Sequence, residues 1–485
     1  MNLMWFRNDL RVHDNPALFN AISSGPTIAV YCLAQDQWRK HDVAPIKQNL
    51  ILRQLVALKD DLNEINVPLL VVNSHDFSGV ISQLDAIFDE YNITEVMFNH
   101  EYEWNENQLT ELVSTHCINK NIHINGFHDQ CLITPGTIHN KQGGYYKVFT
   151  AFKKAYLAQL SHQMRPLYRK PNKQEPLSLA SNITCAVDAL RAINSQNKKS
   201  NIWQVKWPVG EQYVHDVLAV FVEKDIDQYH VKRDIPNVKG TSKLSAYLAI
   251  GIISVRQCYQ AALSMTSLVK DDGTQTWIVE LIWRDFYRHL MVSYPEVCRY
   301  KPFKVNTDQL PWKQSGPLFK AWCEGKTGYP IVDAAMRQLV QTGWMHNRLR
   351  MISAMFLTKH LFIDWRLGEQ FFMQHLIDGD LASNNGGWQW SASTGVDAVP
   401  YFRIFNPTRQ SQRFDPDGDF IRRYVTELNA LDASSIHQPS TEQIIQCGYM
   451  EPVVNHKQAV ELTKHWFKQL SDNSNYYVSP ESQAS

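Results

Sequence analysis

Short apolar runs alternate with amphipathic stretches along the first third of the chain. The apolar runs predict buried strands at residues 3–6, 27–32, 67–72, 95–98 and 122–124. Between them, residues 46–63 and 79–91 carry apolar side chains at helical spacing. Strands that alternate with helices in this way predict an α/β domain with a doubly wound parallel sheet over residues 1–130. No glycine-rich GxGxxG follows the first strand, which argues against ordinary dinucleotide binding.

The second half of the chain has a helical pattern instead. Apolar residues recur at helical spacing over residues 242–251, 276–293, 330–342, 347–359 and 367–376. We therefore expect an all-α domain over residues 206–470. Periodicity fades over residues 131–205, which we expect to be an interdomain linker. The polar, serine-rich residues 471–485 are expected to be a disordered tail.

Composition narrows the class of protein. The chain has 485 residues, 44% of them hydrophobic and 20% charged, which excludes global disorder. It has no apolar run long enough to span a membrane and no secretory signal pattern, so we expect a cytoplasmic protein. The 8 cysteines show no metal-ligand spacing, so neither disulfides nor a metal site is expected.

Charge is balanced overall, with 48 basic and 48 acidic residues, so an anionic partner requires a local patch. One basic interval without any acidic residue runs from residue 141 to 173. It contains Lys141, Lys147, Lys153, Lys154, Arg165, Arg169, Lys170 and Lys173. This pattern is typical of a solvated linker helix and loop. The alternative is one flank of a surface that faces phosphates.

Charged and aromatic residues share one stripe of the predicted helix at 276–293. Trp277, Glu280, Arg284 and Tyr287 lie at positions i, i+3, i+7 and i+10. Glu280 and Arg284 have the spacing of an ordinary surface ion pair. Because large aromatic rings bracket both charges, the stripe also fits a cleft for a planar, polar ligand.

Three further stretches carry candidate chemistry. Residues 378–387 hold two carboxylates and two amides in a predicted loop that leads into Trp388 and Trp390. A calcium loop and a glycosidase pair fit this stretch less well than contacts to the edge of a ring system. Residues 240–245 supply hydroxyls at a helix start, which suits a phosphate or an ordinary helix cap. In residues 342–351, Gly343 is expected to end one helix and Asn347 to open or brace the next, while His346 alone is typical of a satisfied histidine.

Several long motifs together resemble the photolyase/cryptochrome flavoproteins. They lie at residues 5–11, 327–333, 344–348, 378–390 and 414–418 and so cover almost the whole chain. The similarity is greatest to the bacterial class I cyclobutane pyrimidine dimer photolyases. It implies a bound FAD in the helical domain. The implied flavin contacts are Tyr229, Thr241, Ser242, Lys243, Leu244, Ser245, Trp277, Arg284, Asn347, Arg350, Asp378, Asp380 and Asn384.

The resemblance also implies a substrate, UV-damaged DNA, and a light-driven reaction. Excited FADH⁻ donates an electron to a flipped-out dimer, the cyclobutane ring opens, and the electron returns. Glu280 is expected to stabilise the charged dimer, and Asn384 to face flavin N5. The implied DNA contacts are Arg233, Glu280, Trp283, Asn347, Arg348, Met351 and Trp390. Trp388, Trp365 and Trp312 match a chain that photoreduces oxidised flavin, although each alone is typical of a core aromatic.

An antenna chromophore is implied as well, with one departure from the family pattern. His41, Asn105, Glu106, Cys298 and Arg299 match the residues that bind 5,10-methenyltetrahydrofolate in folate-type members. Arg299 stands where we expect lysine, which keeps the charge but changes the shape. An 8-hydroxy-5-deazaflavin antenna therefore remains an alternative.

A cryptochrome, which senses blue light without repairing DNA, is the main alternative. Plant cryptochromes tend to carry Asp where this chain has Asn384, and many have longer tails, so both features favour repair. Asn347 stands where a (6-4) photolyase is expected to have a second histidine, which favours the cyclobutane lesion. A single-strand-specific DASH-type member, a dark flavin electron carrier and a DNA-binding scaffold are further alternatives. We expect the protein to act as a monomer.

Overall fold

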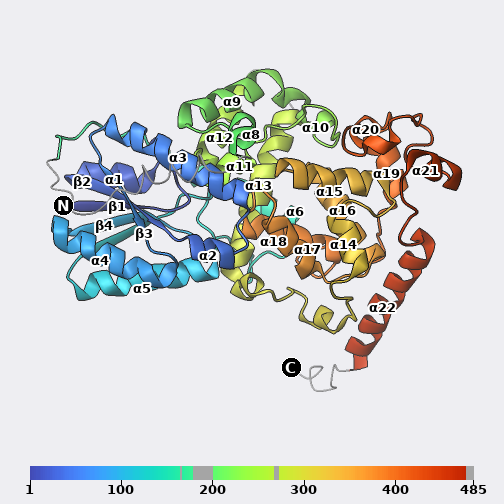
Figure 1. Cartoon of the computed structure of the whole chain (residues 1–485). Coiled ribbons are helices and arrows are strands. Elements are labelled where there is room, and N and C mark those ends of the chain that lie inside the picture. The colour runs from blue at the N-terminus through green and yellow to red at the C-terminus, as the bar shows by residue number, and fades with distance from the viewer. Residues whose placement is uncertain (164–165, 178–199, 267–271, 477–485) are drawn as a thin grey trace. The chain divides into compact units, whose positions relative to one another are not determined.

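A computed structural model of the chain describes residues 1–163, 166–177, 200–266 and 272–476 (Figure 1). Two compact units emerge, and each consists of three pieces of the chain. Unit 1 comprises Met1–His230, Thr241–Pro295 and Ile377–Asp380. Unit 2 comprises Val231–Gly240, Glu296–Leu376 and Leu381–Ser485. These boundaries differ from the expected domain limits at residues 130 and 205, because helices from the middle of the chain belong to the same compact unit as the sheet.

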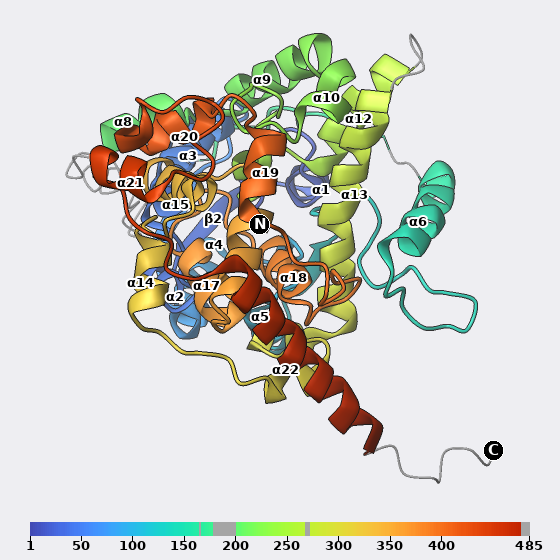
Figure 2. The same cartoon turned by 90° about the vertical axis from the view of Figure 1, so that its right-hand side faces the viewer.

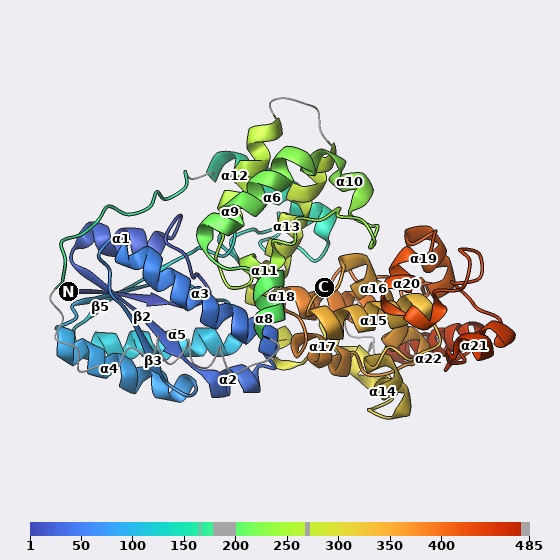
Figure 3. The same cartoon turned by 45° about the horizontal axis from the view of Figure 1, so that its top comes forward.

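The sheet of unit 1 has five parallel strands in the order β3-β2-β1-β4-β5. The strands are β1 (Asn2–Phe6), β2 (Thr27–Leu33), β3 (Leu69–Asn73), β4 (Glu95–Asn99) and β5 (His123–Phe127). The helices between them are α1 (Pro16–Ser24), α2 (Gln35–Lys40), α3 (Pro45–Asn63), η1 (Phe77–Gly79), α4 (Val80–Tyr91) and α5 (Trp104–Asn119). Helices α1 and α3 cover one face, and α4 and α5 cover the other (Figure 3). The predicted doubly wound sheet is confirmed.

The rest of unit 1 is helical. Its elements are α6 (Phe149–Gln163), α8 (Ser200–Lys206), α9 (Glu211–Lys224), η2 (Ile226–Gln228), α11 (Ser245–Leu248), α12 (Val255–Thr266) and α13 (Asp272–Ser293). α10 (Tyr229–Lys232) and η3 (Pro295–Arg299) span unit boundaries. Helix α13 is the longest helix of this region, and α6 and α12 pack against it (Figure 2). The basic interval thus contains a helix, α6, while its member Arg165 lies outside the described residues.

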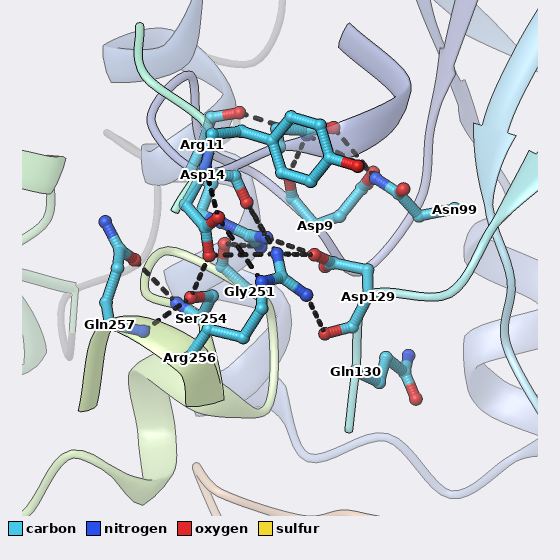
Figure 4. Close-up of polar contacts among 12 residues, drawn as sticks. Asp9, Arg11, Asp14, Asn99, Asp129, Gln130, Gly251, Ser254, Arg256 and Gln257 are labelled. Carbon is cyan, nitrogen blue, oxygen red and sulfur yellow. Dashed lines mark hydrogen bonds and ion pairs between the residues drawn. The ribbon is translucent and has the colours of Figure 1, made fainter. Parts of the chain in front are cut away.

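A buried charge network ties the helical part of unit 1 to the loops that follow the strands (Figure 4). Asp129 Oδ1 accepts from Arg11 Nη2 at 2.5 Å and from Arg256 Nη2 at 2.7 Å. Arg256 Nη2 also lies 2.9 Å from Asp14 Oδ2, which accepts from Ser254 Oγ at 2.5 Å. Buried charges are tolerated when they are paired and fully hydrogen-bonded, and here each carboxylate has several donors.

Unit 2 contains helices alone among its described elements. They are η4 (Val305–Gln309), α14 (Pro317–Cys323), α15 (Pro330–Thr342), α16 (Asn347–Met355), η5 (Phe356–His360), α17 (Trp365–Met373), α18 (Leu381–Ala392), α19 (Pro407–Phe414), α20 (Asp419–Tyr424), η6 (Thr426–Leu428), α21 (Thr441–Cys447) and α22 (His456–Tyr476). Their apolar faces form one large core cluster that includes Trp322, Trp365 and Trp388. Gly343 ends α15 with φ of 70°, as expected from its position, and α16 begins at Asn347.

Three helical boundaries differ from those predicted. The helix expected at 242–251 is reduced to the short α11, because Lys243 has a positive φ of 55°. The helix expected at 347–359 changes after Met355 into the π-helical turn η5. Helix α22 continues to Tyr476, because its apolar face, including Phe467 and Leu470, packs on unit 2. Residues 471–476 of the expected disordered tail are therefore helical, and 477–485 lie outside the described residues. Within the described residues no helix is long and apolar enough to cross a membrane.

Candidate active site

The predicted flavin contacts are divided between the two units. Unit 1 holds Tyr229, Thr241, Ser242, Lys243, Leu244, Ser245, Trp277, Arg284, Asp378 and Asp380. Unit 2 holds Asn347, Arg350 and Asn384.

The segment before α11 is rich in hydrogen-bond donors. Residues 239–245 contain two lysines and three hydroxyl side chains but no carboxylate. Ser245 Oγ donates to Asp378 Oδ2 at 2.7 Å, which joins this segment to residues 377–380. Hydroxyls, cations and backbone N–H groups without a competing acid suit the two phosphates of a dinucleotide.

Aromatic side chains of unit 1 bring two predicted flavin contacts together. Trp277 on α13 is buried and packs against Phe221, with ring centroids 5.3 Å apart. Phe221 in turn packs edge-on against Tyr229 at 6.0 Å. Arg284, two turns along α13 from Trp277, donates to the backbone oxygen of Gln130 and lies 3.4 Å from Asp285. The side chain of Arg284 is thus fixed by its neighbours.

Residues 381–390 form a helix rather than the predicted loop. Asparagine and glycine disfavour a helix in isolation, but side-chain bonds hold α18 in place. Asn384 Nδ2 donates to the backbone oxygen of Glu369 at 3.0 Å, and Asn385 Nδ2 donates to Glu369 Oε1 at 2.8 Å. Gln389 Nε2 donates to Asn385 Oδ1, one turn earlier, at 2.9 Å. Only Asp378 to Asp380 of this stretch remain outside a helix, and the amide of Asn384 has a fixed orientation.

The three tryptophans of the predicted electron chain belong to unit 2. Trp365 and Trp388 are fully buried, and Trp312 packs against the same core cluster. In the described part of the chain, the Nε1 atoms of all three are buried without a hydrogen-bond partner. Gly368 permits a close helix approach, because a Cβ there would lie 2.1 Å from Cη2 of Trp388.

The predicted DNA contacts of unit 2 surround the start of α16. His346 Nδ1 caps this helix by accepting from Arg348 N at 3.2 Å. Arg348 Nη2 lies 2.8 Å from Asp234 Oδ1, and Arg350 Nε donates to the backbone oxygen of Met345 at 2.9 Å. The predicted phosphate contact Arg348 therefore already has a carboxylate partner. Met351 and Trp390 are half-buried, on α16 and α18.

Trp283 of unit 1, a predicted stacking surface for the lesion, is covered on one face. The ring of Phe149 stacks on it with centroids 3.5 Å apart and planes 8° from parallel. Trp283 is nevertheless only half-buried. Because an aromatic ring has two faces, Phe149 holds the indole in one plane and occupies one of them.

Three of the predicted antenna residues meet in unit 1. His41 follows α2, while Asn105 and Glu106 lie in the first turn of α5. His41 Nε2 is 2.8 Å from Asn105 Nδ2, and His41 Nδ1 is 3.4 Å from Glu106 Oε1. Burial, together with the neighbouring carboxylates of Glu103 and Glu101, raises the pKa of Glu106 to about 8. The raised pKa favours the protonated form of this carboxyl, which can both donate and accept a hydrogen bond.

The other two predicted antenna residues, Cys298 and Arg299, lie in unit 2. Both belong to the short helix η3, and Arg299 Nη1 is 3.2 Å from Glu296 Oε1. The sequence interpretation missed Glu101 and Glu103 beside Glu106. A signal was present, because Glu101, Glu103 and Glu106 follow directly on a parallel strand, where ligands commonly bind.

Comparison with known proteins decides the family. The family described as DNA photolyase matches residues 2–172, and the family described as FAD binding domain of DNA photolyase matches residues 277–469. The deoxyribodipyrimidine photo-lyase of Vibrio cholerae is 43% identical over 473 residues, covering 96% of this chain and 99% of its own. The chain belongs to the photolyase/cryptochrome family.

Further members of the photolyase/cryptochrome family show the same full-length similarity. The Escherichia coli deoxyribodipyrimidine photo-lyase is 42% identical and covers 94% of this chain and 96% of its own. A class III photolyase from Agrobacterium tumefaciens superimposes with a TM-score of 0.83 at 31% identity, covering 97% and 98% of the two chains. A Synechocystis cryptochrome gives 0.81 at 28% identity, covering 96% and 99%. The family thus includes repair enzymes and cryptochromes on one fold, and the chain carries its FAD-binding domain.

Proposed function

We propose that this protein is a light-driven DNA-repair enzyme that splits cyclobutane pyrimidine dimers. The observation that carries the proposal is the similarity, over nearly the full length of both chains, to relatives named deoxyribodipyrimidine photo-lyase. Asn384 supports repair over sensing, because a neutral amide at the flavin edge does not add the charge of a carboxylate.

The residues present fit FAD. The donor-rich segment 239–245 suits its diphosphate, and Trp277 offers an aromatic wall fixed by Phe221. Asn384 has its amide oriented by the backbone of Glu369. When bound, reduced FAD supplies one electron to the dimer on illumination and takes one electron back after the ring has opened.

The chain's residues bind and orient the lesion. Two carbon–carbon bonds of the cyclobutane ring break, two pyrimidine double bonds re-form, and the returned electron leaves no net redox change. Turning a damaged pair out of the duplex costs less than turning out a sound pair, because it pairs poorly. Trp283, held in plane by Phe149, and Trp390 supply stacking faces, while Glu280 hydrogen-bonds a base edge.

Other predicted DNA contacts hold the backbone and complete the pocket. Arg233 and Arg348 take the flanking phosphates, and Asn347 and Met351 line the pocket. The ion pair of Arg348 with Asp234 is half-exposed and weak enough for a phosphate to compete. Every expected contact comes from one chain, so a monomer suffices for the reaction. The protein is proposed to act on DNA in the cytoplasm.

The antenna site is proposed for 5,10-methenyltetrahydrofolate. His41, Asn105 and Glu106, whose raised pKa favours its protonated form, give unit 1 a donor–acceptor edge that suits a pterin ring. Cys298 and Arg299 are proposed to complete the site. A deazaflavin is the competing chromophore, and reconstitution with either compound, followed by absorption and excitation spectra, decides between them.

Illumination of the reduced protein with a thymine-dimer oligonucleotide tests the function. We expect intact thymines to appear under blue light, measured by chromatography, and none in the dark. A photosensor of the cryptochrome type will bind FAD and absorb the light but leave the dimer intact, and that result contradicts the proposal.

Glu280→Ala tests the residue closest to the chemistry. We expect the quantum yield of repair to fall several-fold with flavin occupancy unchanged, because a hydrogen bond to the charged dimer is lost. Gln275→Ala, an exposed change on the same helix, is the matched control and leaves the yield unaltered. An unchanged yield in Glu280→Ala removes this side chain from the mechanism.

A further inference from the structure

The short segment Ile377–Asp380 belongs to unit 1, although the chain on both sides of it belongs to unit 2. Three side chains hold three consecutive residues of this segment. Ser245 Oγ donates to Asp378 Oδ2 at 2.7 Å, Lys47 Nζ donates to the backbone oxygen of Gly379 at 2.6 Å, and Arg288 Nη2 donates to Asp380 Oδ1 at 2.5 Å. The three donors come from α11, α3 and α13, elements far apart in the sequence.

Lys47 occupies an unfavourable position for a lysine. It is half-buried, in the first turn of α3, where the helix dipole disfavours a positive charge. Burial lowers the pKa of its amine, whereas the carboxylates of Asp380 and Glu103 act in the opposite direction. The favourable contacts that offset both costs come from Gly379 and from these carboxylates.

Arg288 holds the neighbouring residue from the other direction. It is buried, and its Nε donates to Gln130 Oε1 at 3.2 Å while Nη2 binds Asp380. One bond therefore fixes the backbone of the segment at Gly379, and the bonds on either side fix the carboxylates of Asp378 and Asp380. Neither carboxylate can turn without breaking a charge-assisted bond or the bond to Ser245.

We propose that Lys47 is a positioning residue for the flavin site. By binding Gly379 and offsetting the negative charge around it, Lys47 holds the carboxylates of Asp378 and Asp380 in the orientation that receives FAD. This inference rests on the proposed function in one respect, that Asp378 and Asp380 contact the flavin. The residue acts from the α/β part of unit 1, through the segment, without itself touching the cofactor.

Lys47→Met tests the proposal, because it removes the charge and the donor but keeps the length of the side chain. The first measurement uses the flavin-free protein and needs no light. We expect hydrogen–deuterium exchange of the peptide covering residues 377–381 to become about tenfold faster, since the segment loses its backbone anchor. The second measurement is the dissociation constant for added FAD, from flavin fluorescence, which we expect to rise about tenfold.

Matched variants separate charge, hydrogen bond and general damage. Lys59→Met removes a lysine from the same helix α3 and leaves both measurements unchanged. Lys47→Arg keeps the charge and the donors, so we expect FAD affinity within about threefold of the unmodified protein. Lys47→Gln keeps a donor without the charge and gives an intermediate effect. It also supplies both measurements if Lys47→Met does not fold.

Each outcome bears on the proposal. Unchanged exchange and unchanged FAD affinity in Lys47→Met overturn it. Faster exchange with unchanged FAD affinity also overturns it, because Lys47 then anchors the segment without serving the cofactor. If the unmodified protein binds no FAD, the proposed function fails and the positioning role falls with it. If the unmodified protein binds FAD and Lys47→Met shows both faster exchange and weaker FAD binding, the positioning role is supported.

Discussion

Two buried clusters in this protein differ in how their polar atoms are hydrogen-bonded. In the charge network of unit 1, Asp129, Arg11, Arg256 and Asp14 are bound to one another by several short hydrogen bonds (Figure 4). In the core of unit 2, the indole N–H groups of Trp312, Trp365 and Trp388 are buried with no acceptor in the described part of the chain.

The contrast fits two different tasks. Charged groups that must keep loops in register are held by several bonds each, so that no single rearrangement frees them. An indole that loses an electron becomes strongly acidic, and a basic acceptor at Nε1, such as a carboxylate, would remove its proton and trap the charge. On the proposed function, burial without an acceptor keeps the charge mobile along the tryptophans. On the proposed function, these unsatisfied buried donors serve the electron chain, whereas the bonds of the charge network serve stability.

Breaking the charge network should have the largest effect. Asp129→Asn leaves the buried Arg11 and the half-buried Arg256 with one carboxylate partner fewer, and we expect a loss of about 3–5 kcal/mol in the free energy of unfolding. Urea denaturation at pH 7 measures it. Asp36→Asn, which breaks the exposed pair with Arg39 in the same unit, is the control and should cost less than about 1 kcal/mol. Equal losses in the two variants contradict the role given to burial.

Replacing Trp388 of the proposed electron chain should have the second-largest effect. We expect Trp388→Phe to slow photoreduction of oxidised flavin about a hundredfold, equivalent to about 2.7 kcal/mol on the rate scale, while sparing repair by chemically reduced protein. Flavin absorbance under blue light follows the reaction.

Trp322 provides a matched control for that experiment. Its ring packs edge-on against Trp388 at 6.0 Å, but its Nε1 donates to the backbone oxygen of Ser353 at 3.0 Å. Trp322→Phe makes the same change of size in the same core, and photoreduction should persist. If Trp388→Phe photoreduces at the unmodified rate, the electron takes another route.

The smallest effect should appear in the pH dependence of stability. Burial lowers the pKa of His346 to about 4, so between pH 6.5 and 4 the folded protein binds fewer protons than the unfolded chain. The free energy of unfolding therefore falls on acidification across this window. His346→Asn keeps a helix-capping acceptor and removes the titration, and it should flatten the slope by about 1 kcal/mol per pH unit.

Urea denaturation between pH 4 and 6.5 checks this result, with the exposed His465→Asn as the control. A slope in His346→Asn equal to that of the unmodified protein contradicts the assignment. Part of the slope should remain in any case, because burial also lowers the pKa of His360 to about 3 and of His289 to about 4.

The sequence allowed the sheet to be predicted because β1, β2, β3 and β4 each contain a continuous apolar run that is buried. Strand β5 was expected to be buried as well, but its residues are exposed or half-buried. The helix α18 could not be predicted, since its asparagines and glycines have low helix propensity and its stability comes from Glu369, fifteen or more residues earlier in the chain. The unit boundaries were also hidden, because helical periodicity shows that a face is buried but not what buries it.

The candidate site, like the fold, could be predicted only in part from the sequence. Motifs named the residues that a cofactor or substrate would touch, such as Asn384 and Glu106. The motifs did not indicate the residues that hold those contacts. Examples are Phe149, which stacks on Trp283, and Lys47, which donates to Gly379. Such supporting contacts join positions more than a hundred residues apart, and no local pattern of residue types marks them.

The place of residues 377–380 in the chain has a consequence for biosynthesis. A ribosome delivers Lys47, Ser245 and Arg288 well before it delivers the residues they bind. Until residue 380 has left the exit tunnel, Lys47 and Arg288 of the nascent unit lack their contacts with Gly379 and Asp380. Unit 1 can therefore complete its folding only after much of unit 2 has been translated. For the same reason, no single cut of the polypeptide yields either unit whole.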